Sequence, residues 1–330
     1  MQIKRHDEEE TEAVASSSGM KRRCESLPKN NTSRKVRKKA PTAALPTSPT
    51  LGCTTLSVPR PLPMVVRNDP AVSGSTTKKT ILIWDLDETL LLFSSLCTGQ
   101  FARSVGKNTA ASVALGESMM CFVFTILEKY LFFDDVEKDT VGHVSHMARF
   151  DDGRSLLQYD FASDALNHDP VDSPSRMRKL AYRYRRIRQI YEREETVAFL
   201  TQGTKEAAFC GDLRESIDAF GDGWGRAAQR ALQASVAAGY TNLLVTNSQL
   251  VPALCKCLIY SLDPWFTPDA IYSSSHIRKK QCFDMIRATY GHDCTYIGVG
   301  DGPEEQRASV DCGMSFVEVY AFMYDALTST

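Results

Sequence analysis

The first 79 residues contain no phenylalanine, tyrosine or tryptophan, yet they hold eight of the chain's fourteen prolines. A segment with so little bulky apolar surface cannot offset the conformational entropy that ordering it would cost. We therefore expect residues 1–79 to form a disordered tail and residues 80–330 to form the folded domain.

The sequence also lacks an apolar run close to the roughly 20 residues that cross a bilayer, and it has no secretory signal at its start. Its ten cysteines are scattered rather than grouped, and Cys255 and Cys257 form a lone C-x-C pair without a second pair of zinc ligands. These absences predict a soluble intracellular protein with reduced thiols and no membrane contact.

Charge of one sign is not in excess, because the formal net charge is −1, and we expect no direct nucleic-acid binding. Positive charge is nevertheless concentrated in Lys21–Arg23 and Arg34–Lys39, two clusters of the tail separated by ten residues. This spacing suits a two-part signal for a nuclear import carrier and predicts a protein of the nucleus and cytoplasm. The alternative is a solvated charge run.

From Lys79 onward, short apolar runs alternate with helical patterns. The expected strands are Ile81–Trp84, Asn242–Val245, Thr295–Val299 and Ser315–Val319. The expected helices run from about Pro252 to Ser261, Lys279 to Tyr290 and Pro303 to Cys312. Strand and helix in alternation predict an α/β fold with a doubly wound, mostly parallel sheet, whose ligand site lies beyond the carboxyl ends of the strands.

Carboxylates gather at those strand ends. Asp85 and Asp87 follow the first strand, and Asp301 follows a later one. Oxygen ligands of this kind suit Mg²⁺, which would allow a carboxylate to approach a negatively charged phosphate ester, and the second acid of the pair can move a proton. Thr246 and Lys279 can bind phosphoryl oxygens. Each feature alone is more often a solvated turn or a surface lysine, but their joint order on successive strand ends favours a phosphohydrolase.

This order resembles that of the haloacid-dehalogenase-type hydrolases, and longer blocks resemble the Eyes absent family over nearly all of residues 80–320. The blocks are Trp84–Ala102 (WDLDETLLLFSSLCTGQFA), Arg176–Tyr191, Asn242–Leu262, Ile271–Ile286 and Gly300–Gln306. The resemblance implies that Asp85 is a nucleophile that forms an aspartyl-phosphate and that Asp87 is the general acid/base. It also implies phosphate binding by Thr246 and Lys279.

The cofactor that the resemblance implies is Mg²⁺, held by Asp85, Asp87 through its main-chain carbonyl, Asp301, and Glu304 directly or through water. Glu305 is the alternative to Glu304, because the acidic stretch is one residue shorter than the animal pattern.

The resemblance further implies a phosphotyrosine protein substrate and a nuclear regulatory role in transcription or development, with a homeodomain-type transcription factor as partner. The tail lacks the Tyr-rich activation region of animal members, which leaves that partnership open. Two alternatives remain: a serine/threonine phosphatase of the same superfamily, since DLDETL also opens that family, and a nuclear coactivator or scaffold with little catalytic activity.

Residues 103–240 separate the first and second motifs and are expected to form a mainly helical insertion. Within it, Arg176–Tyr191 carries apolar residues at helical spacing and arginines mostly off that face. Two interpretations of this helix are open. It could be a docking surface for an acidic partner, or a packed helix with a solvated basic face, and the second is favoured. His143 and His146 share the spacing of one helix face, which is more typical of an incidental pair than of a metal site.

Overall fold

The computed structural model describes residues 78–319. By its internal contacts the chain divides into residues 1–77 and 78–330. The predicted disordered tail and both basic clusters, Lys21–Arg23 and Arg34–Lys39, lie outside the described residues, apart from the last two residues of that tail.

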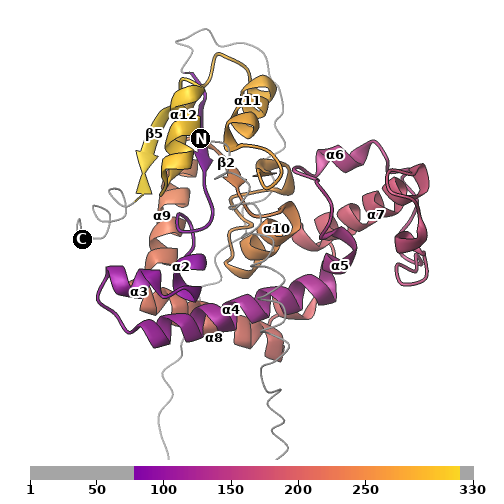
Figure 1. Cartoon of the computed structure of the whole chain (residues 1–330), viewed down its shortest axis with the longest axis horizontal. Helices are drawn as coiled ribbons and strands as arrows, with labels where there is room; N and C mark the ends of the chain where they lie inside the picture. The colour runs from indigo at the N-terminus through magenta and orange to yellow at the C-terminus, as the bar shows by residue number, and fades with distance from the viewer. Residues whose placement is uncertain (1–77, 320–330) are drawn as a thin grey trace, which may run out of the picture. The chain divides into compact units, whose positions relative to one another are not determined.

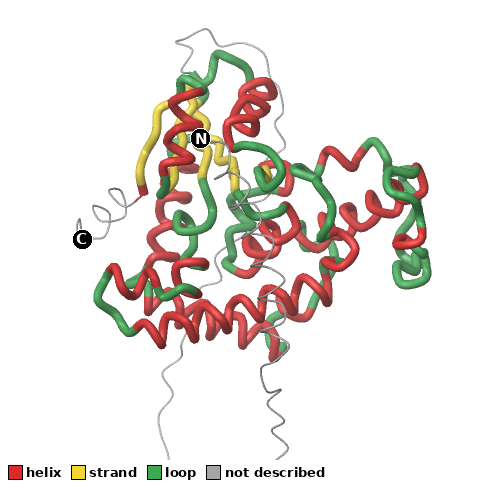
Figure 2. Tube along the Cα trace, in the orientation of Figure 1, coloured by secondary structure: helices red, strands yellow, loops and turns green. Residues whose placement is uncertain are grey.

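The described unit is built on a parallel sheet of five strands, which lies towards the upper left in Figures 1 and 2. The strands are β1 (Thr80–Trp84), β2 (Thr241–Thr246), β3 (Ile271–Ser273), β4 (Thr295–Gly300) and β5 (Ser315–Glu318). Their order in the sheet is β3-β2-β1-β4-β5. The chain thus winds outward in both directions from β1, and in sheets of this kind the ligand crevice lies at the carboxyl ends of the central strands, here β1 and its neighbours. The predicted doubly wound α/β fold is confirmed.

Helices cover both faces of the sheet, as the alternation along β1 requires. Ile81 and Ile83 belong to a buried cluster with side chains of the C-terminal helices, whereas Leu82 and Trp84 belong to the larger core on the other face. The covering helices are α9 (Trp224–Ala237), α10 (Leu250–Ile259), α11 (Lys279–Tyr290) and α12 (Pro303–Asp311). α11 and α12 contact β2 and β4 on one face, and α9 and α10 contact β2 and β3 on the other.

The insertion between β1 and β2 is helical, as predicted. Its α-helices before α9 are α2 (Ser94–Cys97), α3 (Gln100–Ser104), α4 (Thr109–Tyr130), α5 (Phe133–Val136), α6 (Ser145–Ala148), α7 (Pro174–Tyr191) and α8 (Lys205–Phe220). Short 3-10 turns occur at Leu166–His168, Ala198–Leu200 and, before β3, Pro268–Ala270. The side chains of Asn108, Ser173 and Thr204 cap α4, α7 and α8 by accepting a backbone N–H of the first turn.

One described helix, α4, is long and apolar enough to cross a membrane by length and composition, contrary to the expectation that no run approaches that length. Its apolar residues have another use in this fold. Met119, Val123 and Ile126 are buried in the main core, and α4 packs against α2, α8 and α10. Because a core helix passes the same test, the length of α4 assigns no membrane role.

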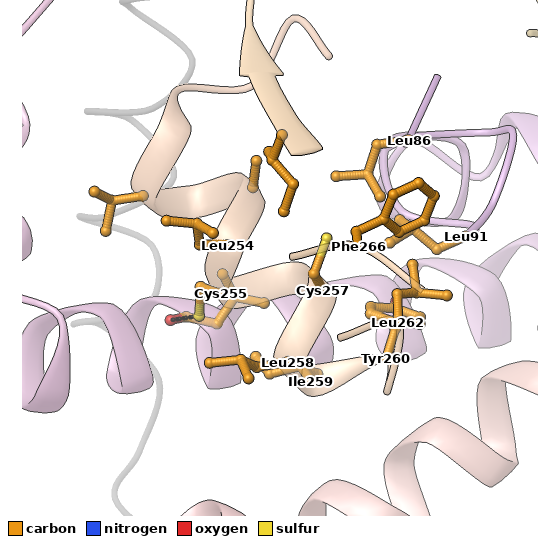
Figure 3. Packing of buried hydrophobic residues seen from close by; sticks show 14 of the residues in the cluster. Leu86, Leu91, Leu254, Cys255, Cys257, Leu258, Ile259, Tyr260, Leu262 and Phe266 are labelled. Atoms are coloured by element: carbon orange, nitrogen blue, oxygen red, sulfur yellow. Dashed lines mark hydrogen bonds between the residues drawn. The ribbon is translucent and has the colours of Figure 1, made fainter. Parts of the chain in front are cut away.

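The core beneath the strand ends includes nearly all of α10. Figure 3 shows Cys255 and Cys257 of this helix among apolar neighbours, with Leu86 and Leu91 of the loop after β1 in the same cluster. Burial raises the pKa of Cys257 to about 12 and that of Cys255 further. Both thiols therefore act as small apolar side chains.

The insertion contacts the edge strand β3 and the turn before it. The backbone N–H of Ser273 donates to the carbonyl of Gly142 over 2.8 Å. His143 stacks on Tyr272 with ring centroids 4.4 Å apart, and its Nε2 lies 3.0 Å from the carbonyl oxygen of Asp269. The imidazole is thus engaged in packing rather than offered to a metal.

Candidate active site

The loop after β1 places two carboxylates at the crevice. The N–H of Asp85 donates to the Val299 carbonyl over 2.8 Å, which extends the ladder between β1 and β4 by one residue. The loop then closes tightly, because the N–H of Glu88 donates to the Leu91 carbonyl and Glu88 itself has a φ of 59°. Asp85 is buried and Asp87 half-buried.

Asp85 is held from two sides. The Lys279 ammonium lies 2.6 Å from Oδ1, and the Thr89 hydroxyl lies 3.5 Å from Oδ2. Burial raises the pKa of Asp85 to about 7, against the lowering effect of Lys279. Burial would lower the pKa of Lys279, but Asp85 and Glu305 together raise it above its ordinary value. Lys279 is therefore a cation, as its predicted phosphate-binding role requires, and it already has two carboxylate partners.

Asp301, predicted as a metal ligand, lies beside Asp85. The Thr89 hydroxyl is 3.4 Å from Asp301 Oδ1, so the two carboxylates face the same hydroxyl from different strands. Burial, with the charge of Glu305 as a second cause, raises the pKa of Asp301. Lys279 thus pairs with two of the three acidic groups at this corner of the crevice, Asp85 and Glu305, and the corner has an excess of negative charge.

The two candidate glutamates of the acidic motif have different surroundings. Glu304 is exposed and accepts a hydrogen bond from Asn247 Nδ2 over 2.8 Å. Glu305 is buried and pairs with Lys279. A Cβ at Gly300 would lie 2.6 Å from Glu305 Cγ, so that glycine leaves room for the side chain of Glu305. The structure therefore brings Glu305, not Glu304, to the centre of the site.

Thr246 ends β2 beside the loop after β1. The register pairs Trp84 with Leu244, so Thr246 lies level with the first residues beyond β1. Thr246 is buried, and its Oγ1 accepts the N–H of Ser248 over 3.1 Å.

The structure adds two residues that sequence reasoning missed. Lys256, on α10, has its ammonium 2.8 Å from both carboxylate oxygens of Asp87. Ser248 donates its hydroxyl to Asp87 Oδ2 over 3.0 Å. A lone lysine within an otherwise apolar helix was the available signal for Lys256, whereas no local pattern singles out Ser248.

The predicted magnesium ligands converge only in part. Within residues 78–319, no three side chains of His, Cys, Asp or Glu are grouped to hold a metal ion. The carboxylates of Asp85 and Asp301 do meet at Thr89, but the side chain of Asp87 is turned to Lys256 and that of Glu304 to Asn247. The buried carboxylate of Asp85 and the half-buried carboxylate of Asp301, in a region of excess negative charge, fit a hard divalent cation that completes its shell with main-chain oxygens and water.

The basic face of α7 is neutralised within the fold. Four arginines of this helix, Arg183, Arg185, Arg186 and Arg188, pair with acidic residues of neighbouring segments. The partners are Asp135, Asp164, Asp151, Glu195, Glu192 and Asp269. Leu180, Tyr184 and Ile187 are buried in the main core. The helix is thus packed, in agreement with the favoured interpretation. Its basic face is not simply solvated, because most of its arginines form ion pairs.

The sheet order and the acidic residues at its strand ends are those of a haloacid-dehalogenase-like α/β fold. No family model matches the chain. Among curated proteins, it is 34% identical to human protein phosphatase EYA2 over 76% of its own length and 48% of that protein.

Two further relatives are also named as EYA protein phosphatases. The chain is 28% identical to Arabidopsis thaliana protein phosphatase EYA over 72% of its length and 82% of that protein. It is 39% identical to the curated Gallus gallus protein phosphatase EYA3 over 36% of its length and 100% of that sequence. The chain therefore belongs to the Eyes absent family, although it spans about half the length of the human relative.

Proposed function

We propose that the protein is a magnesium-dependent phosphatase that uses Asp85 as nucleophile and acts on phosphotyrosine in proteins. The environment of Asp85 carries this proposal. One carboxylate oxygen is anchored by Lys279, while the other faces Thr89 beside Asp301, at the carboxyl end of the central strand. A carboxylate held in this way can present its free oxygen to phosphorus for in-line attack. Because the surroundings are negatively charged, a cation is needed to bind a phosphate beside it.

The chemistry has two halves. Oδ2 of Asp85 attacks phosphorus, the bond from phosphorus to the ester oxygen breaks, and the departing oxygen takes the proton of the Asp87 carboxyl group. Water then attacks the aspartyl-phosphate and gives a proton to the Asp87 carboxylate, which releases inorganic phosphate and restores Asp85. Lys279 and Thr246 bind the phosphoryl oxygens. Asp85 and Asp301 would hold Mg²⁺, which would supply the positive charge that offsets the repulsion between the carboxylate and the phosphate.

The substrate class is proposed from kinship, because the relatives' names read protein phosphatase and the geometry constrains the phosphate more than the alcohol. We further propose the nuclear regulatory role, with a homeodomain-type partner and import through the basic clusters of the tail. The serine/threonine phosphatase is the second candidate enzyme, and a scaffold with little activity is the third reading.

Initial rates on matched phosphotyrosine and phosphoserine peptides, with Mg²⁺ or with a chelator, test the proposal. We expect magnesium-dependent activity with a preference for phosphotyrosine, and a loss of about 10³-fold or more in Asp85→Asn. Asp284→Asn is the matched control, because Asp284 is a surface carboxylate paired with Lys280. Equal rates for wild type and Asp85→Asn would reject the nucleophile, and a phosphoserine preference would favour the second candidate.

A further inference from the structure

Lys256 is the only charged residue of α10, and it is buried among that helix's apolar side chains. Its ammonium makes four contacts. Both oxygens of Asp87 lie 2.8 Å away, the Ser248 hydroxyl lies 3.0 Å away, and the ring of Phe93 lies beneath it with its centroid at 4.3 Å. These contacts define the position of the ammonium from several directions.

Packing does not require a lysine at this position. The other α10 side chains are apolar, and all except the half-buried Pro252 are buried, so an apolar residue of similar length would satisfy the helix. An unpaired ammonium at this buried position would carry a large desolvation cost. The charge at Lys256 is therefore explained by its partner, Asp87, rather than by the core.

The contacts also distinguish the two oxygens of Asp87. A carboxylate has about four acceptor sites, two on each oxygen. Oδ2 accepts from Lys256 and from Ser248, whereas Oδ1 accepts from Lys256. One acceptor site therefore remains on Oδ1, and this is the oxygen that can exchange a proton with a bound substrate.

We propose that Lys256, together with Ser248, is a positioning residue that fixes the Asp87 carboxyl group for proton transfer through Oδ1. This inference rests on the proposed function, in which Asp87 protonates the departing oxygen. Proton transfer needs a heavy-atom separation of about 2.6–3.2 Å, and a carboxyl group free to rotate about its side-chain bonds would hold that separation only part of the time. Lys256 touches neither the nucleophile nor the phosphate in this scheme.

The role predicts a dependence on the leaving group. A p-nitrophenolate departs without a proton, whereas the more basic phenolate needs one. Loss of positioning should therefore slow phenyl phosphate hydrolysis far more than p-nitrophenyl phosphate hydrolysis. A merely structural role would slow both reactions alike.

The test compares wild type, Lys256→Met and Ser248→Ala in steady-state kinetics on the two aryl phosphates at saturating Mg²⁺ and one pH. For Lys256→Met we expect kcat on phenyl phosphate to fall about 100-fold and kcat on p-nitrophenyl phosphate by less than about 10-fold, with KM little changed. Ser248→Ala should also slow phenyl phosphate hydrolysis more than p-nitrophenyl phosphate hydrolysis, but the difference should be smaller than for Lys256→Met. Lys129→Met, which removes a surface lysine paired with Glu206, should leave both rates unchanged.

A double-mutant cycle gives the second criterion. In an Asp87→Asn background, Lys256→Met should cause no further loss, because the group that it positions is absent. Equal losses on both substrates, or a full additional loss in that background, would overturn the inference while leaving the proposed function intact. A wild type inactive on both substrates would instead contradict the proposed function itself. Should Lys256→Met fail to fold, Ser248→Ala and Lys256→Arg carry the same comparison.

Discussion

Two clusters of buried charge in this molecule have similar composition and opposite character. In the insertion, Arg183 is 1% exposed and pairs with Asp135 and Asp164. At the strand ends, Lys279 is 2% exposed and pairs with Asp85 and Glu305. Each cluster therefore has one buried cation and two carboxylates.

Their carboxylates respond differently to burial. Burial by itself would raise the pKa of Asp164, but hydrogen bonds from Arg183 and Tyr159 lower it below its ordinary value. At the strand ends burial prevails, and the pKa of Asp85 is raised to about 7. In the insertion, the ion pairs of Arg183 favour the charged carboxylate of Asp164 and hold neighbouring segments together. At the strand ends, burial favours the neutral form of Asp85. Such a group is suited to a ligand.

The largest expected effect on stability is that of Asp164→Asn. This change leaves Arg183 short of a buried partner and should lower the free energy of unfolding by about 3 kcal/mol. Because the folded pKa of Asp164 is lowered, its contribution is present above the unfolded pKa of about 4 and is lost as pH falls through the folded value. Urea unfolding of wild type and Asp164→Asn at pH 7 and at pH 3 measures the loss of stability and its dependence on pH.

Asp284→Asn again serves as the control, with an expected change within about 0.5 kcal/mol, since its pair is exposed. An Asp164→Asn variant as stable as wild type at pH 7 would show that the two clusters do not differ in the way described.

Gly300→Ala tests the packing of the strand-end cluster. The added Cβ would lie 2.6 Å from Glu305 Cγ and 2.9 Å from its Cβ, so Glu305 must move away from Lys279. We expect a loss of roughly 1–3 kcal/mol in the free energy of unfolding, with a fall in phosphatase rate.

Gly211→Ala is the matched control, because nothing lies within 4 Å of its added Cβ and the residue is inside α8. There we expect a gain of about 0.5–1 kcal/mol and unchanged kinetics. A tolerated Gly300→Ala would mean that the position of Glu305 does not depend on the missing side chain at residue 300.

The smallest effect on stability is expected from Asp85→Asn, and it has the opposite sign. An acid with a raised folded pKa favours folding below its unfolded pKa and loses that contribution as pH rises towards about 7. Asp85→Asn still leaves Lys279 paired with the buried Glu305. Removing the charge of Asp85 should therefore raise the free energy of unfolding at pH 8 by about 1 kcal/mol in the presence of a chelator, while activity is lost.

Added Mg²⁺ sharpens the contrast, because it should stabilise the wild type and not Asp85→Asn. Thermal melts with and without Mg²⁺ provide this readout without any substrate. Equal stabilisation of both proteins would argue against Asp85 as a metal ligand.

The sequence predicted the sheet because its central strands, such as Ile81–Trp84, are continuous apolar runs that end at polar residues. It missed β3, whose three residues are too few for a period to show. The helical insertion was predictable as a region, but its loop contacts, such as Gly142 with Ser273, depend on chain segments about 130 residues apart.

For the candidate site, Asp85, Lys279 and Asp301 were found because each follows a strand or begins a helix in order. Glu305 could not be separated from Glu304, since both lie in the first turn of α12 and only the fold decides which one faces Lys279. Lys256 reaches Asp87 from 169 residues away, a contact that no local spacing encodes.

The bond between Gly142 and Ser273 has a consequence for motion and solubility. A three-residue strand at the border of a sheet offers free backbone groups to any other extended chain. Here the insertion occupies part of that border. If the insertion moved away from β3, this strand could pair with other chains and aggregate. The insertion helices are therefore better described as a fixed wall of the crevice than as a lid.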